Sequence, residues 1–359
     1  MFKQSNWKRI SAAALTGLVA AVVAGGAQAL ELKLSDQFPA GHTITKGGTK
    51  AFFDHIQAHP EADLSVAHFP AEQLGKAATM LDQVQNRVAD IAVVGMSYVP
   101  EKMPLSTMME LPGLYTSSFD GYVPYAQLAK EDLSGLEYDR HKVKLLWVIV
   151  TPPYQLLFKR KESVTDIAQL NGVKTRVAGA TAELAAKSLG MVPVKVAAPD
   201  LYVALERGTL DAAVYTLSVM RAYKLDEVTE SYTDNASMGG VGFAAFINVD
   251  VWNSLSPEQQ KVITEASDAA GFATACAMMK SDLEAQAYLK EKGKNVYSLS
   301  EPVLAAFSER LSSVEKAWTE QLGARNLPAT DTIEKFKKLQ KQARDDGSVK
   351  AAHDKCLGS

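Results

Sequence analysis

Cysteine is scarce in this 359-residue chain, which contains only Cys276 and Cys356. Two cysteines do not make a structural zinc site by themselves, because such a site needs further Cys or His ligands. In an oxidising compartment the two thiols can form a disulfide. Cys276 lies within an apolar, helix-like run, however, where a cysteine also serves as a small buried side chain. The sequence leaves both interpretations open.

The chain also lacks a strong charge bias and the usual catalytic motifs. Its formal net charge is -3, and it has no low-complexity segment and no long run of one sign. This balance does not indicate nucleic acid or an anionic membrane as a partner. The patterns G-x-S-x-G, H-E-x-x-H, the P-loop and G-x-G-x-x-G are all absent. We therefore expect a function other than catalysis, with no catalytic residues, no cofactor and no resident metal ion.

The amino terminus carries a targeting signal. Three basic residues precede an apolar segment over residues 10–26, and the small-x-small sequence Ala-Gln-Ala follows at 27–29. This order is typical of a secretory signal peptide. The apolar segment is short for a membrane span and ends at a cleavage site. We expect residues 1–29 to be removed, which leaves a periplasmic protein that begins at Leu30 and has no stable membrane insertion.

Strand and helix patterns alternate over the first two thirds of the chain. Apolar strand patterns occur at 32–35, 64–69, 90–95, 143–150, 173–178, 192–196, 210–215 and 243–248. Helical periodicity fills most of the intervals between them. The segments NRVADIAVVG (86–95) and RGTLDAAVYT (207–216) share one build, a helix end followed by an Asp that opens a strand. The pattern predicts an α/β protein with two lobes of similar construction and mostly parallel sheets.

The last third of the chain changes to helix. Ser256 can cap a long helix that we expect to run to about Lys292, with an interruption near Gly271. Two amphipathic helices are expected to follow, at 301–322 and 330–345. The tail after Gly347 is expected to be poorly ordered unless Cys356 anchors it.

The candidate ligand-binding residues are those that follow the predicted strands, because ligands of parallel α/β sheets bind beyond the carboxyl ends of strands. Arg176 ends one strand just before a helix start near Thr181. Its fork of N–H donors suits a carboxylate, and a helix amino terminus attracts an anion. Alternatively, Arg176 and Lys174 share the solvent face of an edge strand. The positions considered are Gln37, Phe38, Phe69, Gly95, Met96, Ser97, Tyr98, Tyr154, Gln155, Arg176, Tyr215 and Thr216.

Two histidines offer a weaker candidate for a metal site. His55 and His59 lie four residues apart in a helical segment, a spacing that suits a metal pair. His59 abuts Pro60, however, and no third ligand follows at a recognisable spacing. A solvated surface pair is the favoured interpretation, and a periplasmic metal-binding protein remains an alternative function.

Five segments carry a resemblance to a known family. They are FPAEQLGKAATMLDQVQNRVADIAVVG (69–95), ELPGLY (110–115), DIAQLNGVKTRV (166–177), LYVALERGTLDAA (201–213) and FINVDVWNSLSPEQQKVITEAS (246–267). In this order and spacing they resemble the solute receptors of TRAP (tripartite ATP-independent periplasmic) transporters, of the C4-dicarboxylate-receptor type. The resemblance extends from Leu30 to about Asp345.

The resemblance implies two α/β lobes around a ligand cleft, with a long helix that spans both lobes. Lobe I is expected from 30–153 plus 242–281, lobe II from 154–241 plus 282–345, and a tail from 346–359. Such receptors capture a carboxylate-bearing solute, close over it and deliver it to a small and a large membrane subunit for uptake driven by an ion gradient. We expect a monomer.

The resemblance also assigns the carboxylate clamp. The family's G-x-K-x-R arginine stands here as Arg176. Where the family commonly has a carboxylate-binding Asn this chain has Tyr215, and where sugar-acid receptors have another arginine it has Tyr154, Gln155 and Leu156. These departures favour a monocarboxylate with an apolar or aromatic body as the ligand, with a C4-dicarboxylate as the alternative. For Tyr215, the alternative is that its ring packs near the hinge and does not contact the ligand. The expected ligand contacts are Phe38, Met96, Tyr98, Tyr154, Gln155, Arg176, Tyr215 and Phe243.

Overall fold

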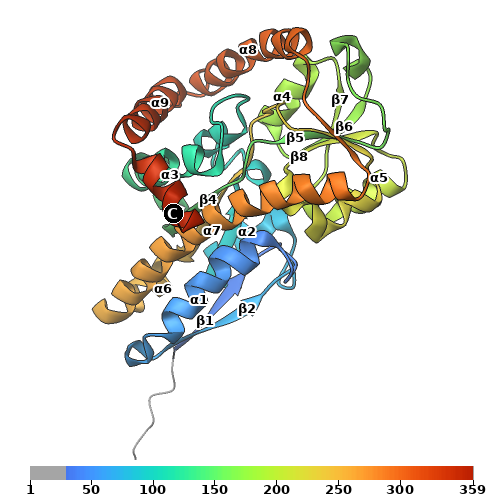
Figure 1. Ribbon diagram of the computed structural model, residues 1–359. Helices are drawn as coiled ribbons and strands as arrows, with labels where there is room; N and C mark the ends of the chain where they lie inside the picture. Colours follow the sequence, from blue (N-terminus) through green and yellow to red (C-terminus); the bar gives the residue numbers. More distant parts are fainter. Residues whose placement is uncertain (1–29, 359) are drawn as a thin grey trace, which may run out of the picture.

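The computed structural model describes residues 30–358 and arranges them in two α/β lobes (Figure 1). The predicted signal peptide, residues 1–29, lies outside the described residues. Each lobe contains one sheet, and the long helix α7 passes along both lobes. The predicted fold class is confirmed.

The sheet of lobe I has five strands in the order β2-β1-β3-β10-β4. These strands are β1 (Leu30–Ser35), β2 (Leu64–Phe69), β3 (Ile91–Gly95), β4 (Val143–Val150) and β10 (Gly242–Asn248). β1, β2 and β3 are parallel, whereas β10 is antiparallel to both β3 and β4. This reversal places Phe243, at the start of β10, opposite Gly95 at the carboxyl end of β3.

The sheet of lobe II has six strands in the order β11-β9-β5-β8-β6-β7. Its strands are β5 (Gln155–Phe158), β6 (Lys174–Val177), β7 (Val192–Lys195), β8 (Ala212–Tyr215), β9 (Ser231–Thr233) and β11 (Asn295–Tyr297). β6 lies between β7 and β8, so Arg176 is not on an edge strand. β5 runs antiparallel to β8 and pairs Gln155 with Tyr215. The sheets are therefore mixed rather than mostly parallel.

Helices cover both sheets. They are α1 (Lys50–Gln57), α2 (Met80–Gln85), α3 (Ser118–Leu128), α4 (Ala180–Ser188), α5 (Leu201–Glu206), α6 (Val249–Ser254), α7 (Pro257–Glu291), α8 (Glu301–Gly323), α9 (Ala329–Asp345) and α10 (Ser348–Leu357). Two 3-10 segments, η5 (Leu105–Glu110) and η10 (Leu217–Tyr223), border the space between the lobes. Among residues 30–358, no helix is both long enough and apolar enough to cross a membrane.

Helix α7 is continuous over 35 residues, contrary to the expected interruption near Gly271. It begins with a capping box in which Ser256 and Gln259 satisfy each other's backbone N–H groups. A Cβ atom at position 271 would lie 2.4 Å from the Tyr122 hydroxyl, so Gly271 permits the close approach of α3 rather than breaking the helix. α7 packs on α1 and β4 in lobe I and on η10 and β11 in lobe II.

Two chain crossings between the lobes run side by side near the middle of the molecule. The backbone N–H of Thr151 donates to Val241 over 3.2 Å, and that of Met238 donates to Tyr154 over 2.9 Å. α7 makes the third crossing. A paired crossing of this kind is a suitable hinge, because it lets the lobes rotate without breaking either sheet.

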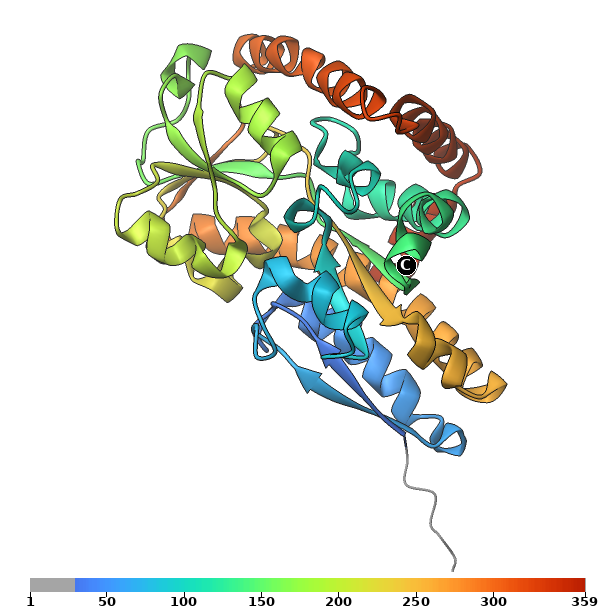
Figure 2. The same ribbon diagram turned by 180° about the vertical axis from the view of Figure 1, so that it is seen from behind.

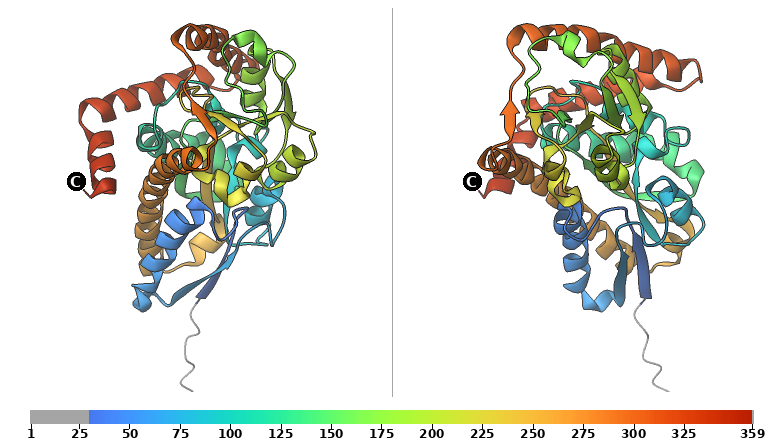
Figure 3. Two further views of the ribbon diagram at one scale, coloured as in Figure 1. Left: turned by 45° about the vertical axis from the view of Figure 1, so that its right-hand side comes forward. Right: turned by 90° about the vertical axis from the view of Figure 1, so that its right-hand side faces the viewer.

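The carboxyl terminus is helical and anchored, which corrects the expectation of a loose tail. α10 follows Gly347, and Cys356 on α10 forms a disulfide with Cys276 on α7. Figures 2 and 3 show α8 and α9 passing along the outside of the lobes before α10 turns back. α8 packs on α4 of lobe II and α9 on α3 of lobe I, where Arg344 makes two bonds of 2.6 and 2.7 Å to Asp120. The proposed lobe boundaries remain a prediction.

Candidate ligand-binding site

A small cavity lies between the lobes, where strand ends of both sheets meet. Wider hollows lie on the outer surface, one between α8 and α9 and one bordered by β4 together with α3, α6 and α7. The cavity is lined by Gln37, Phe38, His42, Ile44, Tyr98, Thr151, Tyr154, Ala198, Tyr215, Val219, Tyr223, Phe243 and Met278. These residues include no Asp, Glu, Lys or Arg, so the lining carries aromatic and aliphatic surface with a few neutral polar groups.

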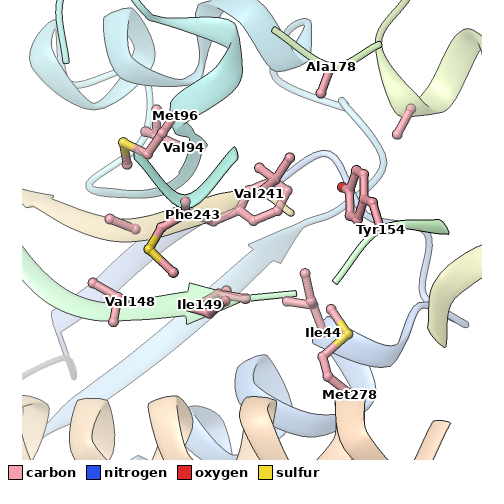
Figure 4. Packing of buried hydrophobic residues seen from close by; sticks show 14 of the residues in the cluster. Ile44, Val94, Met96, Val148, Ile149, Tyr154, Ala178, Val241, Phe243 and Met278 are labelled. Carbon is pink, nitrogen blue, oxygen red and sulfur yellow. The ribbon is translucent and has the colours of Figure 1, made fainter. Parts of the chain in front are cut away.

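An unbroken series of rings joins the two lobes around this cavity. Phe38 contacts Phe243 edge-on at 5.4 Å between ring centroids and stacks on His42 at 4.6 Å. The series continues into lobe II, with centroid distances of 5.5 Å for His42–Tyr223, 6.4 Å for Tyr223–Tyr215 and 5.6 Å for Tyr215–Tyr154. Figure 4 shows Tyr154 and Phe243 facing the same space, with Ile44 and Met278 beside it. Such a lining favours a flat, apolar body.

Arg176 lies directly behind the lobe II end of this series. Its side chain is buried, at 1% exposure, and its guanidinium carbon is 5.1 Å from the centre of the Tyr215 ring. Nε donates to the Val196 carbonyl over 2.8 Å and Nη1 to the Val214 carbonyl over 3.2 Å. Within the described residues 30–358 it forms no ion pair with a carboxylate. The alternative of a solvent-facing arginine is therefore wrong.

Glu110 occupies the helix start that we expected to attract the ligand's anion. Its Oε2 accepts a 3.1 Å bond from the backbone N–H of Ala182, in the first turn of α4. A Cβ at Gly179 would lie 2.8 Å from Oε1, so Gly179 leaves room for the carboxylate at this N-cap. Burial raises the pKa of Glu110 to about 7, while the Ala182 N–H and the Arg176 charge oppose that rise. A lobe I carboxylate thus caps a lobe II helix.

Three polar groups of the lining were not predicted as ligand contacts. Gln37 Oε1 and the Tyr223 hydroxyl are buried without a hydrogen-bond partner in the described part of the chain. His42 Nδ1 accepts a bond of 3.1 Å from the Ile44 N–H, so the ring proton is on Nε2. Burial lowers the pKa of His42 to about 3, which keeps the ring neutral. The sequence analysis included Gln37 among the residues that follow a predicted strand, whereas no sequence pattern indicated that His42 or Tyr223 lines the cavity.

The eight predicted contacts divide into three groups. Those that line the cavity are Phe38, Tyr98, Tyr154, Tyr215 and Phe243. Arg176 lies behind the Tyr215 ring. Met96 is packed in the core and Gln155 is turned away: the Gln155 Oε1 accepts bonds from the Thr233 hydroxyl (3.0 Å) and the Ala236 N–H (2.9 Å). Gln155 therefore joins β5 to the segment after β9.

Tyr98 links the lobes across the cavity. Its phenolic oxygen accepts a 3.2 Å bond from the backbone N–H of Ala198 in lobe II. A second link runs from the Thr43 hydroxyl to the Ser218 carbonyl, over 2.9 Å. Together with Glu110 on α4, these bonds hold the lobes in a closed arrangement.

Comparison with known proteins agrees with this architecture. The family model of bacterial extracellular solute-binding proteins, family 7 (DctP), matches residues 34–321. A solute-binding protein from Albidiferax ferrireducens is 22% identical over 309 residues, which cover 84% of this chain and 89% of that protein.

Two solved structures share the fold. A TRAP solute-binding protein from Rhodoferax ferrireducens, in complex with copurified benzoate, has a TM-score of 0.81 at 20% identity and covers 89% of this chain and 99% of its own. A TRAP solute-binding protein from an unidentified marine microbe is specific for aromatic acid ligands and was crystallised with 3-hydroxybenzoate; its TM-score is 0.81 at 25% identity, covering 87% and 98% of the two chains. This chain belongs to the DctP family of bacterial extracellular solute-binding proteins, family 7, and is a TRAP-type solute-binding receptor rather than an enzyme.

Proposed function

We propose that this receptor binds an organic monocarboxylate with an aromatic or otherwise flat apolar body in the cavity between the lobes. The observation that carries the proposal is the combination of an aromatic lining with a single buried guanidinium behind it. The rings receive the body of the solute, and Arg176 receives its carboxylate at the Tyr215 end.

Charge balance favours one carboxylate over two. A buried arginine without a direct ion pair is costly, and an anionic ligand in contact with it reduces that cost beyond the charge interaction that the Glu110 carboxyl provides. The lining has no second cation, because His42 is neutral and no Lys or Arg contributes to it. A second carboxylate, as in a C4-dicarboxylate, would be desolvated without compensation. The alternative of a C4-dicarboxylate receptor is therefore the less favoured one.

The ligands of the structural relatives support the same chemistry. Benzoate and 3-hydroxybenzoate each combine one carboxylate with one ring. A ring of this kind matches the series of aromatic side chains from Phe243 to Tyr154. The neutral polar groups of Gln37, His42 and Tyr223 are suited to recognise a substituent such as a hydroxyl on the ring.

Binding is coupled to lobe closure in this proposal. The ligand contacts residues of both lobes, so it binds the closed form better than the open one and shifts the equilibrium toward closure. The Tyr98–Ala198 and Thr43–Ser218 bonds form as the lobes meet. The mature receptor, exported to the periplasm by its signal peptide, then delivers the acid as a monomer to the small and large TRAP membrane subunits.

A thermal-shift screen with mass measurement of any copurified acid tests this function. We expect benzoate, 3-hydroxybenzoate and phenylacetate to raise the Tm, and succinate and malate to leave it unchanged. A ligand at 100 times its Kd stabilises the bound state by about 2.7 kcal/mol, and each kcal/mol raises Tm by roughly 1–2 °C in a protein of this length. A response to the dicarboxylates alone would make the C4-dicarboxylate alternative correct.

A further inference from the structure

Three side chains with metal-ligating atoms meet outside the cavity, at the carboxyl end of α1. They are His55 on α1, His59 just after it, and Glu265 on α7. One ligand atom of each lies within 4.8 Å of the others. α1 and α7 lie side by side in lobe I (Figure 1). The third ligand that the sequence did not reveal thus comes from a helix some two hundred residues further along the chain.

His59 is held in the tautomer that a metal ligand needs. Its Nδ1 lies 2.8 Å from the backbone carbonyl of His55. A carbonyl oxygen only accepts, so Nδ1 carries the ring proton and Nε2 keeps its lone pair. A bond from the remote ring nitrogen to a carbonyl is the usual way in which proteins orient a metal-ligating imidazole.

His55 presents a nitrogen with no hydrogen-bond partner. Its Nε2 is buried and unpartnered in the described part of the chain, and it lies 3.7 Å from Oε2 of Glu265. The two imidazoles stack with their centroids 4.4 Å apart. Among the described residues, Lys261 is the only further charged residue that forms an ion pair with this cluster. Its Nζ lies 4.0 Å from Oε1 of Glu265, and its side chain is largely exposed. Oε2 therefore remains free to bind a cation.

We propose that His55, His59 and Glu265 form a surface site for a divalent transition-metal ion, with Zn²⁺ the best match, that links α1 to α7. Two imidazole nitrogens and one carboxylate oxygen form a known type of zinc ligand set, with water in the fourth position. Cu²⁺ and Ni²⁺ also suit imidazole, whereas Mg²⁺ and Ca²⁺ prefer oxygen ligands.

The geometry permits the required contraction. Zinc–nitrogen and zinc–oxygen bonds are about 2.0–2.2 Å long, so the three ligand atoms must move closer together than they are here. The side chains of His55 and Glu265 are 26% and 45% exposed, which leaves room for small rotations. The site lies on the outside of lobe I, so it does not contribute to the solute cavity.

Calorimetric titration of ZnCl2 into the mature, tag-free protein tests the proposal. We expect one saturable site for Zn²⁺, none for Mg²⁺, and a rise in Tm with Zn²⁺ that EDTA reverses. His55→Ala and His59→Ala should each weaken zinc binding at least tenfold, and Glu265→Gln should weaken it less.

His353→Ala is the matched control, because His353 is exposed on α10 and is not one of the three clustered residues. We expect it to leave zinc affinity unchanged. Absence of a saturable zinc site, or equal affinity in the wild type and the His59→Ala and Glu265→Gln variants, would overturn the proposal. Because the site is separate from the cavity, these variants should bind the organic acid like the wild type, which separates this test from that of the proposed function.

Discussion

At the residue scale, Arg176 is unusual because it is a buried guanidinium with two carbonyl partners and, among residues 30–358, no carboxylate. Two of its N–H groups donate to the carbonyls of Val196 and Val214, and its guanidinium carbon lies over the Tyr215 ring, 5.1 Å from its centre. In direct contact the protein supplies carbonyl dipoles and a ring, while the buried Glu110 carboxyl interacts with the guanidinium through its charge without an ion pair. A ligand carboxylate completes this environment, which is the physical basis of the proposed specificity.

Replacement of Arg176 is the most direct test of this role. A hydrogen bond to a charged group contributes about 1.5–3 kcal/mol, so we expect Arg176→Ala to weaken binding of the organic acid by roughly 10–150-fold. Arg176→Lys keeps the positive charge but loses the forked N–H donors, so its affinity for the acid should lie between those of the wild type and Arg176→Ala. Calorimetry gives the affinities, and circular dichroism confirms that each variant is folded. Arg221→Ala, at an arginine that lies on the ring of Tyr288, is the matched control and should bind normally. Unchanged affinity in Arg176→Ala would contradict the assignment.

Tyr215 determines the character of the ligand rather than its charge. Its ring lies between Tyr154, Tyr223 and Arg176 and lines the cavity. We expect Tyr215→Asn to shift the ligand profile from aromatic toward more polar acids, because it removes ring surface and adds an amide. A thermal-shift panel of aromatic and hydroxylated acids measures the change. Tyr202→Asn, outside the cavity, should leave the profile as it is. An identical profile in both variants would mean that Tyr215 only packs near the hinge.

At the element scale, the sequence was most informative where strands are apolar and long. The strands of lobe I and the central strands β6 and β8 follow the predicted runs closely. The short strands β5, β9 and β11 were missed. β6 and β8 are also only four residues long, but each lies within a longer strand pattern, at 173–178 and 210–215. The antiparallel direction of β10 was also missed, because strand direction depends on pairing partners that the local sequence does not specify.

The disulfide between α7 and α10 is expected to matter for stability but not for binding. It closes a loop with a sequence separation of 80 residues, and such crosslinks typically contribute about 2–4 kcal/mol. Cys276 and Met278 are two residues apart, so on a helix their side chains point about 200° apart, and only Met278 faces the cavity.

We therefore expect the Cys276→Ser, Cys356→Ser double variant to unfold at lower denaturant concentration and to bind the acid within twofold of wild type. Chemical denaturation with and without reductant measures the first effect, and calorimetry the second. Equal stability of reduced and oxidised wild-type protein would show that α10 is held by its packing alone.

At the scale of the whole molecule, closure places Glu110 of lobe I on the amino terminus of α4 in lobe II. Burial raises the pKa of this carboxyl from its ordinary 4.5 to about 7. Between these values the folded protein holds the proton more tightly than the unfolded chain does. The stabilising contribution of Glu110 to the free energy of unfolding is therefore fully present below about pH 4.5. It falls as the pH rises to about 7 and stays constant at higher pH. The total loss is at most about 3 kcal/mol.

Glu110→Gln isolates this effect, because the amide oxygen can still accept from Ala182 while the group no longer titrates. Relative to wild type, we expect the variant to gain Tm as the pH rises from 5 to 8. Glu137 has its pKa raised to about 7 by burial as well, so the wild-type profile alone does not assign the effect. Glu61→Gln, at an exposed residue, should leave the profile unchanged. Parallel profiles of Glu110→Gln and wild type would show that Glu110 does not titrate in this range.

The sequence by itself determined the family, the two α/β lobes, the long helix and the candidate arginine, because these depend on periodicity within a segment and on motifs of a few residues. Only the tertiary structure showed that Gln155 faces away from the cavity, that His42 and Tyr223 line it, and that Glu110 fills the helix start expected for the ligand. Each of these facts is a contact between residues far apart in the chain. Local propensity acts over a few neighbouring residues, whereas such contacts are decided by the packing of two lobes against each other.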